Sequence, residues 1–563
     1  MRNFFQLVKT FGNSNTESQR DSGAKPRVVP QSGKLPWENR SQGNNPNGVA
    51  ARRTQRDATP LGLKQIPATI TQGSSCLAIP RLRDWRTQSL WDWGNQRAAC
   101  NATRRTTDGD GQTALSLAGG CKLFLGLLFL AAITLPAFAL DGAIGIHDPS
   151  TVAVCDGKYY VFGTGRGISV LTSSNGFNWQ RGGKVFDRIP DSVKQFCPKN
   201  DGQGVWAPDI IKLNGEYFLY YSISFWGQYV SAVGLLTNPT LNTNAANYKW
   251  TDRGMVVHSS EGEDLNAIDP GLIHAPDGTL WICYGSYHGS IELVELNPKT
   301  GLPIATNSPV TIIASQSEAS EIIFHDKYFY LFVNHGGCCQ GSNSTYNIRV
   351  GRSPKITGPY LDRYGVLMSQ GGGTLFLAAA GRQIGPGHFG LLLDDGVEKF
   401  SCHYEAELGR AGRSILDIRP LLWTADGWPM PGENIRDGTY QIRSQRTGTI
   451  LQASTNAVET ARYLVHENQK WNVAPAGEGV YKITSAAGEN ALTAMNETAT
   501  TTPFTGAENQ LWKIDQLADG SHRIASKTGT LALTATFKTK PGNGIALEKF
   551  AGDDAQRWII TAP

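Results

Sequence analysis

The sequence predicts an all-β protein in which a five-bladed β-propeller is followed by a β-trefoil. Three observations carry this prediction. The 563 residues include 63 glycines and 28 prolines without a collagen-like period, a composition typical of turn-rich β structure. Five strand–turn–strand units recur between residues 141 and 432, and a second repeat recurs three times at 41-residue spacing after residue 437. Helical periodicity is almost absent.

The first 139 residues differ from the remainder in charge. They hold 18 Lys and Arg against 8 Asp and Glu, whereas residues 140–563 hold 34 against 40. The basic residues lie among Gln, Asn, Ser and Thr without regular periodicity, so we predict that residues 1–115 are disordered or not part of the working protein. A nucleic-acid partner is not expected, because it would need basic residues interleaved with aromatics on a folded face.

Residues 116–139 have the pattern of a secretory signal peptide. Lys122 precedes a run of 16 largely apolar residues, and Ala137 and Ala139 provide the small residues of a cleavage site. The run is short for a bilayer span, which needs about 20 residues, although a signal anchor is the alternative. Since signal peptides lie at the N-terminus, we hypothesise that translation starts shortly before Lys122 and that the extension is not translated.

Residues 140–434 contain five similar hairpins. Each joins an apolar strand, a turn of the Asp-Gly or Asn-Gly kind and an aromatic-rich strand, which is a strong hairpin signal. Their regular spacing predicts the blades of a five-bladed propeller. The hairpins span residues 152–163, 209–221, 271–284, 321–332 and 389–400.

A short polar segment precedes each hairpin. The innermost strand of a propeller blade starts near the central axis, so equivalent positions should converge on one pocket. We place Asp148, Asp269, Glu321 and His388 at such positions in four blades. Carboxylates focused on one pocket separate their pKa values, so that a proton donor and an ionised base can coexist. Each residue alone is more simply a turn residue, but the set in register favours a catalytic site.

Several motifs accompany these positions. They are His147-Asp-Pro-Ser150, Trp206-Ala-Pro-Asp209, Ala267-Ile-Asp-Pro-Gly271, Ser320-Glu321, Cys338-Cys-Gln-Gly341, Ser344-Thr-Tyr-Asn-Ile348, Gly371-Gly-Gly-Thr374, Gly385-Pro-Gly-His388 and Ile418-Arg-Pro-Leu-x-Trp423. In these motifs residues 141–434 resemble glycoside hydrolase family 43, and within it the endo-1,5-α-L-arabinanases. The Cys-Cys-x-Gly and Ser-Thr-Tyr-Asn-Ile segments are those that separate arabinanases from the xylosidases of the family.

The resemblance implies a role for each axial residue. Asp148 would be the general base that deprotonates water, Glu321 the general acid, and Asp269 the residue that orients Glu321 and raises its pKa. Family members invert the anomeric centre, which predicts base and acid carboxyls about 6.5–9.5 Å apart. A calcium ion with mainly water ligands is implied near His388, which could otherwise be a hydrogen-bonded core histidine. No organic cofactor is expected.

The substrate-binding and cysteine residues are predicted less directly. By analogy, Trp206 would offer its ring face to a furanose, and further substrate-binding residues would be Asn266, Ser286 and Tyr287, although each could be ordinary blade packing. Six cysteines follow the signal peptide, and their pairing cannot be deduced from sequence. Cys338 and Cys339 could form a strained vicinal disulfide or two separate bonds.

Residues 437–563 carry the second repeat system. The repeats end in Gln469-Lys-Trp471, Gln510-Leu-Trp512 and Gln556-Arg-Trp558. This pattern resembles a ricin-type β-trefoil, in which we expect the Trp side chains to pack the core. The segments that carry a sugar-binding Asp in such lectins read Leu451-Gln-Ala, Leu492-Thr-Ala and Leu533-Thr-Ala here. A carbohydrate-binding domain and a spacer therefore both remain open.

The expected protein is a secreted, monomeric enzyme that cleaves internal α-1,5-links of arabinan or a related plant cell-wall polysaccharide, without stable membrane association. An exo-acting α-L-arabinofuranosidase or β-xylosidase is the alternative among enzymes, because loops at the end of the groove decide endo from exo action. A secreted, non-catalytic carbohydrate-binding protein is disfavoured, because all three carboxylates are present.

Overall fold

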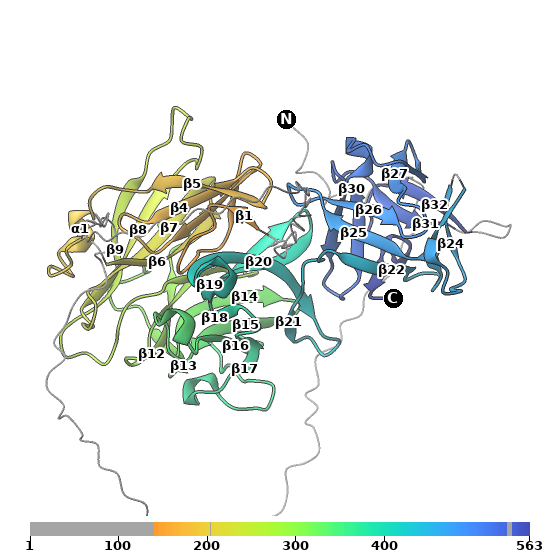
Figure 1. Ribbon diagram of the computed structural model, residues 1–563. Coiled ribbons are helices and arrows are strands. Elements are labelled where there is room, and N and C mark those ends of the chain that lie inside the picture. Colours follow the sequence, from red (N-terminus) through yellow and green to blue (C-terminus); the bar gives the residue numbers. More distant parts are fainter. Residues whose placement is uncertain (1–139, 203, 456, 537–542) are drawn as a thin grey trace, which may run out of the picture. The chain divides into compact units, whose positions relative to one another are not determined.

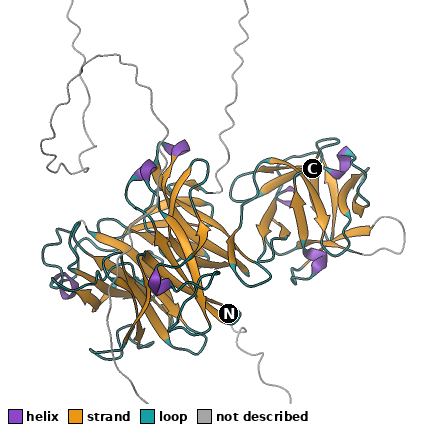
Figure 2. Cartoon of the chain, turned by 90° about the horizontal axis from the view of Figure 1, so that it is seen from below, coloured by secondary structure: helices purple, strands orange, loops and turns teal. Residues whose placement is uncertain are grey.

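The computed structural model describes residues 140–563 except 203, 456 and 537–542 (Figure 1). The predicted extension (1–115) and signal peptide (116–139) therefore lie outside the described residues. Strands dominate this part of the chain, and its α-helix α1 (Asp191–Lys194) is a single turn (Figure 2). No described helix is long and apolar enough to cross a membrane.

The prediction of a five-bladed propeller is confirmed. Within the described residues, one sheet corresponds to each predicted hairpin, and the sheets follow one another along the chain (Figure 1). The first two sheets contain β1 (Asp141–Gly142), β2 (Ala153–Cys155), β3 (Lys158–Gly163), β4 (Ser169–Ser173) and β5 (Asn178–Lys184), then β6 (Val205–Leu213), β7 (Glu216–Ile223), β8 (Ser231–Asn238) and β9 (Thr251–Ser259).

The remaining blades have four strands each in antiparallel order. The third contains β10 (Gly271–His274), β11 (Leu280–Gly285), β12 (Ser290–Leu296) and β13 (Val310–Ser315); the fourth β14 (Glu318–His325), β15 (Tyr328–His335), β16 (Asn347–Ser353) and β17 (Thr374–Leu377); the fifth β18 (Gln383–Asp394), β19 (Val397–Glu407), β20 (Arg413–Trp423) and β21 (Pro429–Pro431).

A separate apolar core lies between each pair of neighbouring blades. Successive residues of a strand point to opposite faces, so β7 sends Leu219 and Tyr221 into the core shared with the first blade. It sends Phe218 and Tyr220 into the core shared with the third blade. Because both faces of each inner sheet are buried, these strands read as continuous apolar runs instead of alternating ones.

The ring closes between the fifth and first blades. Val161 and Leu171 pack with Leu416 in one core cluster. The Leu416 N–H donates to Ile144 O at 2.8 Å, and the Ser414 hydroxyl donates to Ile146 O at 2.6 Å. These bonds fix the segment that leads directly into His147 and Asp148.

The trefoil prediction is also confirmed. Its strands form a 12-stranded sheet system with three equivalent repeats. They are β22 (Gly438–Ser444), β23 (Ile450–Ser454), β24 (Ala457–Ala461), β25 (Trp471–Pro475), β26 (Tyr481–Ser485), β27 (Ala491–Met495), β28 (Thr498–Thr502), β29 (Trp512–Gln516), β30 (His522–Ser526), β31 (Ala532–Ala535), β32 (Asn543–Glu548) and β33 (Trp558–Thr561).

The three Gln-x-Trp motifs build the trefoil core, as expected. Trp471, Trp512 and Trp558 are fully buried. Each indole N–H donates at 2.9 Å to the carbonyl of the leucine that opens the Leu-x-Ala segment of its own repeat, namely Leu451, Leu492 or Leu533. A large apolar side chain and a satisfied polar group are therefore placed identically three times.

The Gln residues of these motifs bind the residue that follows each of those leucines. Gln510 Nε2 donates to Thr493 Oγ1 at 3.4 Å, and Gln556 Nε2 donates to Thr534 Oγ1 at 3.2 Å. Gln469 Nε2 donates to Gln452 Oε1 at 2.9 Å. The residues of the Leu-x-Ala segments where a lectin would carry its Asp thus make hydrogen bonds within the domain.

We expect Trp512→Ala to destabilise the trefoil by about 3–5 kcal/mol, because a fully buried aromatic side chain and its hydrogen bond are lost. Urea titrations followed by hydrogen exchange in peptides from residues 438–563 would measure the change. Trp226→Ala is the matched control, since this tryptophan is 72% exposed. Equal effects of the two substitutions would contradict the assignment of Trp512 to the core.

Candidate active site

Just before the hairpin of each blade, one residue occupies an equivalent position near the axis. Each adopts a left-handed backbone conformation, which is rare for residues other than glycine. They are Asp148 (φ 48°), Ala207 (φ 40°), Asp269 (φ 57°), Ala319 (φ 52°) and His388 (φ 61°). We call these five the axial residues.

The backbone N–H of each axial residue donates to a side chain of the preceding blade. The acceptors are His403 Nδ1 for Asp148 (3.1 Å), Thr164 Oγ1 for Ala207 (2.9 Å), Ser222 Oγ for Asp269 (2.9 Å), Asp269 Oδ2 for Ala319 (3.2 Å) and Asn334 Oδ1 for His388 (3.1 Å). These bonds link all five blades into a closed ring and hold the axial residues in place.

The structure places Asp148, Asp269 and His388 at axial positions, as predicted, but not Glu321. The strand register shifts between Trp206 and Asp209, and it shifts in the same way between Glu318 and Glu321. Glu321 therefore corresponds to Asp209, two residues beyond the axial position. The axial residue of the fourth blade is Ala319, and Glu318 immediately precedes it.

Glu321 lies in a buried layer with Asp209. A Cβ atom added at Gly271 would lie 2.7 Å from Glu321 Oε2, which places this carboxyl against β10. Burial, and then the charge of Asp209, raise the pKa of Glu321. Asp209 accepts hydrogen bonds from the N–H groups of Thr151 (3.0 Å) and Leu272 (3.1 Å). These contacts are those of a structural carboxyl pair joining neighbouring blades.

Glu318 is the carboxyl that faces the two axial aspartates. The Tyr346 hydroxyl donates to its Oε1 at 2.7 Å. Burial raises the pKa of Glu318 to about 7; the Tyr346 hydrogen bond opposes this rise and the negative charge of Asp148 adds to it. Burial, followed by the charges of Glu318 and Asp148, raises the pKa of Asp269 as well.

Asp148 has the opposite electrostatics. Its Oδ1 lies 2.9 Å from His147 Nδ1, and its Oδ2 accepts a hydrogen bond from the Thr164 hydroxyl. Burial alone would raise the pKa of Asp148, but the positive charge and hydrogen bond of His147 outweigh it, so that the pKa lies well below its usual value. An ionised carboxylate and a protonated carboxyl can therefore coexist at this site near neutral pH.

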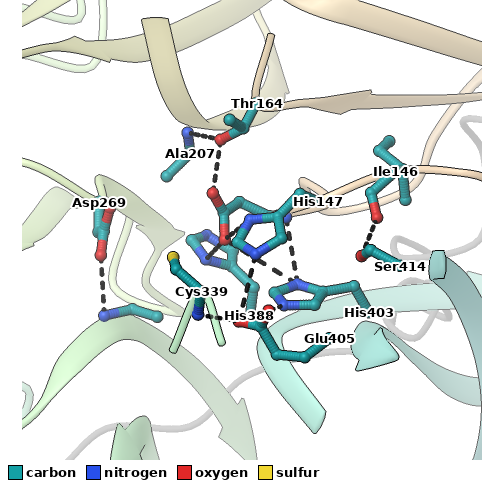
Figure 3. Close-up of polar contacts among 12 residues, drawn as sticks. Ile146, His147, Thr164, Ala207, Asp269, Cys339, His388, His403, Glu405 and Ser414 are labelled. Carbon is teal, nitrogen blue, oxygen red and sulfur yellow. Dashed lines mark hydrogen bonds and ion pairs between the residues drawn. The ribbon is translucent and has the colours of Figure 1, made fainter. Parts of the chain in front are cut away.

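Two residues behind His147 were not identified from the sequence. Glu405 Oε1 lies 3.2 Å from His147 Nε2, and the His403 ring stacks on the His147 ring at 4.2 Å between centroids (Figure 3). His403 and Glu405 both lie on β19, two residues apart, so they face the same side of the strand. That alternation of polar residues in a buried strand is the sequence signal that could have indicated them.

The predicted substrate-binding residues have different surroundings. Trp206 makes an edge contact with the exposed Trp226, with 6.1 Å between ring centroids. Asn266 is buried, and its amide donates to Ser286 Oγ at 3.2 Å while its Oδ1 accepts from Ser231. Tyr287 is 42% exposed, and the charge of Glu318 contributes, after burial, to the rise of its pKa.

Trp206 and Tyr287 therefore offer aromatic surface beside the carboxyl site. Asn266 and Ser286 are instead hydrogen-bonded to each other and form part of the wall of the site. A cavity of about 340 Å³ lies next to this wall. It is lined by residues 227–230, residues 260–264 and His288, whose N–H donates to Ser286 Oγ at 3.3 Å.

The residues near His388 suit a hydrated ion. Burial lowers the pKa of His388 to about 4, so the imidazole is neutral and has a free electron pair. Its Nδ1 lies 3.6 Å from Asp148 Oδ1. Ring nitrogens of His147 and His403 lie near the same oxygen, at 2.9 and 3.9 Å, but His147 is paired with Asp148 and His403 Nδ1 accepts the N–H of Asp148. Because calcium takes 6–8 oxygen ligands, a calcium ion would fit only if it kept most of its waters.

The six cysteines of the described residues are free thiols. Cys155, Cys197, Cys283 and Cys402 are buried, Cys338 is partly exposed and Cys339 is exposed. The thiols of Cys338 and Cys339 are hydrogen-bonded to each other. The structure thus contains neither of the two disulfide arrangements considered for this pair.

Comparisons with known proteins agree with this architecture. Residues 143–429 match the model for glycosyl hydrolases family 43, and residues 467–548 match the model for the ricin-type β-trefoil lectin domain-like family. The first match covers half of the chain, and the second lies in the C-terminal domain.

Several similar proteins are arabinan-degrading enzymes by name. The extracellular exo-α-(1→5)-L-arabinofuranosidase of Cellvibrio japonicus is 36% identical over 316 residues, covering 53% of this chain and 90% of that protein. The extracellular endo-α-(1→5)-L-arabinanase 1 of Bacillus subtilis is 37% identical over 318 residues, covering 54% and 94%. A crystal structure of an exo-1,5-α-L-arabinanase from a bovine ruminal metagenomic library is 39% identical, covers 53% of this chain and 100% of that chain, and has a TM-score of 0.50.

Proposed function

Because the chain belongs to glycosyl hydrolases family 43, we propose that it is a secreted, endo-acting arabinanase that cleaves α-1,5-L-arabinofuranosyl links with inversion. One observation carries the proposal. Asp148 and Glu318 share one buried site, yet their surroundings move their pKa values in opposite directions. That difference is what a base and an acid acting in the same step require.

Asp148 serves as the general base. His147 and Thr164 both contact its carboxylate, so it is ionised and held in one orientation. It accepts a proton from water as that water attacks the anomeric carbon. The separation of about 6.5–9.5 Å between base and acid expected for inversion stays a prediction.

Glu318 takes the role of general acid in place of Glu321. Burial and the charge of Asp148 raise the pKa of Glu318 to about 7, so a large fraction of the carboxyl is protonated near neutral pH and can protonate the departing glycosidic oxygen. Glu321 instead lies in the buried layer with Asp209, two residues beyond the axial position. Asp269 positions Glu318 by accepting the N–H of the next residue, Ala319, at 3.2 Å. Burial and the charge of Glu318 raise the pKa of Asp269 itself.

A calcium ion near His388 is part of the proposal, with His388 Nδ1 and water as its expected ligands. Such an ion supplies positive charge beside Asp148 when it is bound. The aromatic surfaces of Trp206 and Tyr287 suit the apolar faces of furanose rings. We propose that arabinan lies across them, and that the trefoil acts either as a carbohydrate-binding domain or as a spacer.

Exo action is the second candidate. It is supported by two relatives whose names describe exo-acting enzymes, one of them 36% and the other 39% identical to this chain. Secretion is supported by the relatives named as extracellular, together with the predicted signal peptide. Endo action and exo action would both use the same carboxyl site. They would differ only in where the polysaccharide is bound.

Substituting the two glutamates separately distinguishes their roles. We expect Glu318→Gln to lower kcat on debranched arabinan by roughly 10²–10⁴-fold, the usual contribution of a general acid. Glu321→Gln is the matched control, three residues away on the same strand, and should lower thermal stability more than kcat. Activity of Glu318→Gln should recover on a nitrophenyl arabino-oligosaccharide, whose leaving group needs no proton. If Glu321→Gln lost activity and Glu318→Gln kept it, Glu321 would be the general acid, as the sequence resemblance implied.

The pH profile gives an independent check of Glu318. The acid must be protonated to act, so activity should fall as the pH rises through about 7. The Tyr346 hydroxyl donates to this carboxyl and favours its ionised form. Tyr346→Phe should therefore raise the pKa of Glu318 and move the basic limb of kcat to higher pH. Tyr360→Phe, at another buried tyrosine, should leave the limb in place; a limb unmoved by Tyr346→Phe would count against Glu318.

The products decide between endo and exo action. An endo enzyme should lower the viscosity of debranched arabinan quickly and release mixed oligosaccharides, whereas an exo enzyme should release one short product with little early loss of viscosity. Proton NMR of the first product should show the inverted anomer. Asp148→Ala serves as the inactive control, and activity that survives this substitution would exclude Asp148 as the base.

A further inference from the structure

Cys339 and Glu405 form, with His147, a cluster of potential metal ligands. The proposed reaction uses only His147, through its contact with Asp148. The Cys339 Sγ atom, a ring nitrogen of His147 and a carboxylate oxygen of Glu405 all lie within 4.8 Å of one another. The three side chains come from the first, fourth and fifth blades and converge beside the axis (Figure 3). A thiolate, an imidazole and a carboxylate are the ligand types that zinc takes in proteins.

The spacing of these atoms suits a tetrahedral ion. His147 Nε2 lies 3.2 Å from Glu405 Oε1. Two ligands bound tetrahedrally to zinc at 2.0–2.1 Å lie about 3.3 Å apart. An ion could therefore enter between these two atoms with little movement of either side chain.

Each of the three ligands has a supporting partner. Asp148 Oδ1 lies 2.9 Å from Nδ1 of His147, so Nε2 is directed at the cluster. A bound ion would replace the proton on Nε2 and would itself supply the positive charge beside Asp148. The Cys339 N–H donates to Glu405 Oε1 at 2.9 Å, and the Cys338 thiol contacts the Cys339 thiol. Partners of this kind fix the orientation of metal ligands in known sites.

An unpaired donor beside the cluster provides a separate indication. His403 Nδ1 accepts the N–H of Asp148, so the proton of the neutral ring is on Nε2. This Nε2 is fully buried, has no hydrogen-bond partner, and its nearest charged oxygen is Glu405 Oε1 at 3.7 Å. Buried donors without acceptors are rare, and a water molecule bound to an ion in the cluster would accept this one.

We propose that His147, Cys339 and Glu405 form a site for one zinc-like divalent ion, with water as the fourth ligand. Cys339 is exposed, which gives the ion a route from solvent. The site differs in class from the calcium ion expected at His388, because its thiolate ligand suits zinc and does not suit calcium. It does not depend on the proposed substrate or on the identity of the general acid.

Cobalt provides the test, because a cobalt–thiolate bond absorbs in the near ultraviolet. The full-length, reduced protein would be titrated with Co²⁺ in the absence of oxygen, in the presence of excess Ca²⁺ to occupy any calcium site. We expect one equivalent of Co²⁺ to produce the thiolate band together with visible bands of four-coordinate intensity. One equivalent of Zn²⁺ should remove both.

Three variants assign the ligands. Cys339→Ser should lose the thiolate band, whereas Cys338→Ser, the matched control one residue away, should keep it. Glu405→Gln should weaken Co²⁺ binding by at least about 10-fold, the smaller effect known for lost supporting residues. The proposal is overturned if the wild type shows no thiolate band, if the band persists in Cys339→Ser, or if thiol titration of the secreted protein shows Cys338 and Cys339 already joined in a disulfide.

Discussion

The active site depends on a ring of backbone hydrogen bonds around the propeller axis. Each axial residue has a left-handed conformation that costs of order 1–3 kcal/mol when the residue is not glycine. The conformation persists because its N–H is bonded to the preceding blade, and because an apolar core lies between every two blades. Catalytic side chains are thus held by the same bonds that close the ring, and a substitution at one blade acts on its neighbour.

The ring also explains how buried carboxyls with opposite pKa shifts can lie together. Burial raises the pKa of Asp148, Asp269 and Glu318 alike. What separates them is mainly the imidazole of His147. His147 lies against Asp148 and reverses the effect of burial there, whereas Glu318 has only the neutral Tyr346 hydroxyl. Asp148 then remains ionised, and its charge helps to keep the other two carboxyls protonated.

The sequence was sufficient for the folds and for part of the site. The hairpins, the Gln-x-Trp tryptophans, Asp148, Asp269 and His388 follow from local patterns that recur with the repeats. Glu318 did not follow, because the fourth blade has Ala319-Ser320 where the first and third have Asp-Pro, and the register shift there is visible only in the paired strands. Glu405 is 258 residues from His147, and no local pattern links such distant residues.

The closure of the ring accounts for the position of the proposed metal site. Four axial N–H groups bind oxygen atoms of Thr164, Ser222, Asp269 and Asn334, whereas the N–H of Asp148 binds a ring nitrogen of His403. An imidazole that accepts at one nitrogen must carry its proton on the other, on the far side of the ring. At the junction of the first and fifth blades that second nitrogen reaches toward Glu405, where Cys339 and His147 also converge. His403, which positions the proposed base Asp148, therefore places its buried Nε2 donor beside three potential metal ligands. A water molecule bound to an ion there would accept a hydrogen bond from this donor.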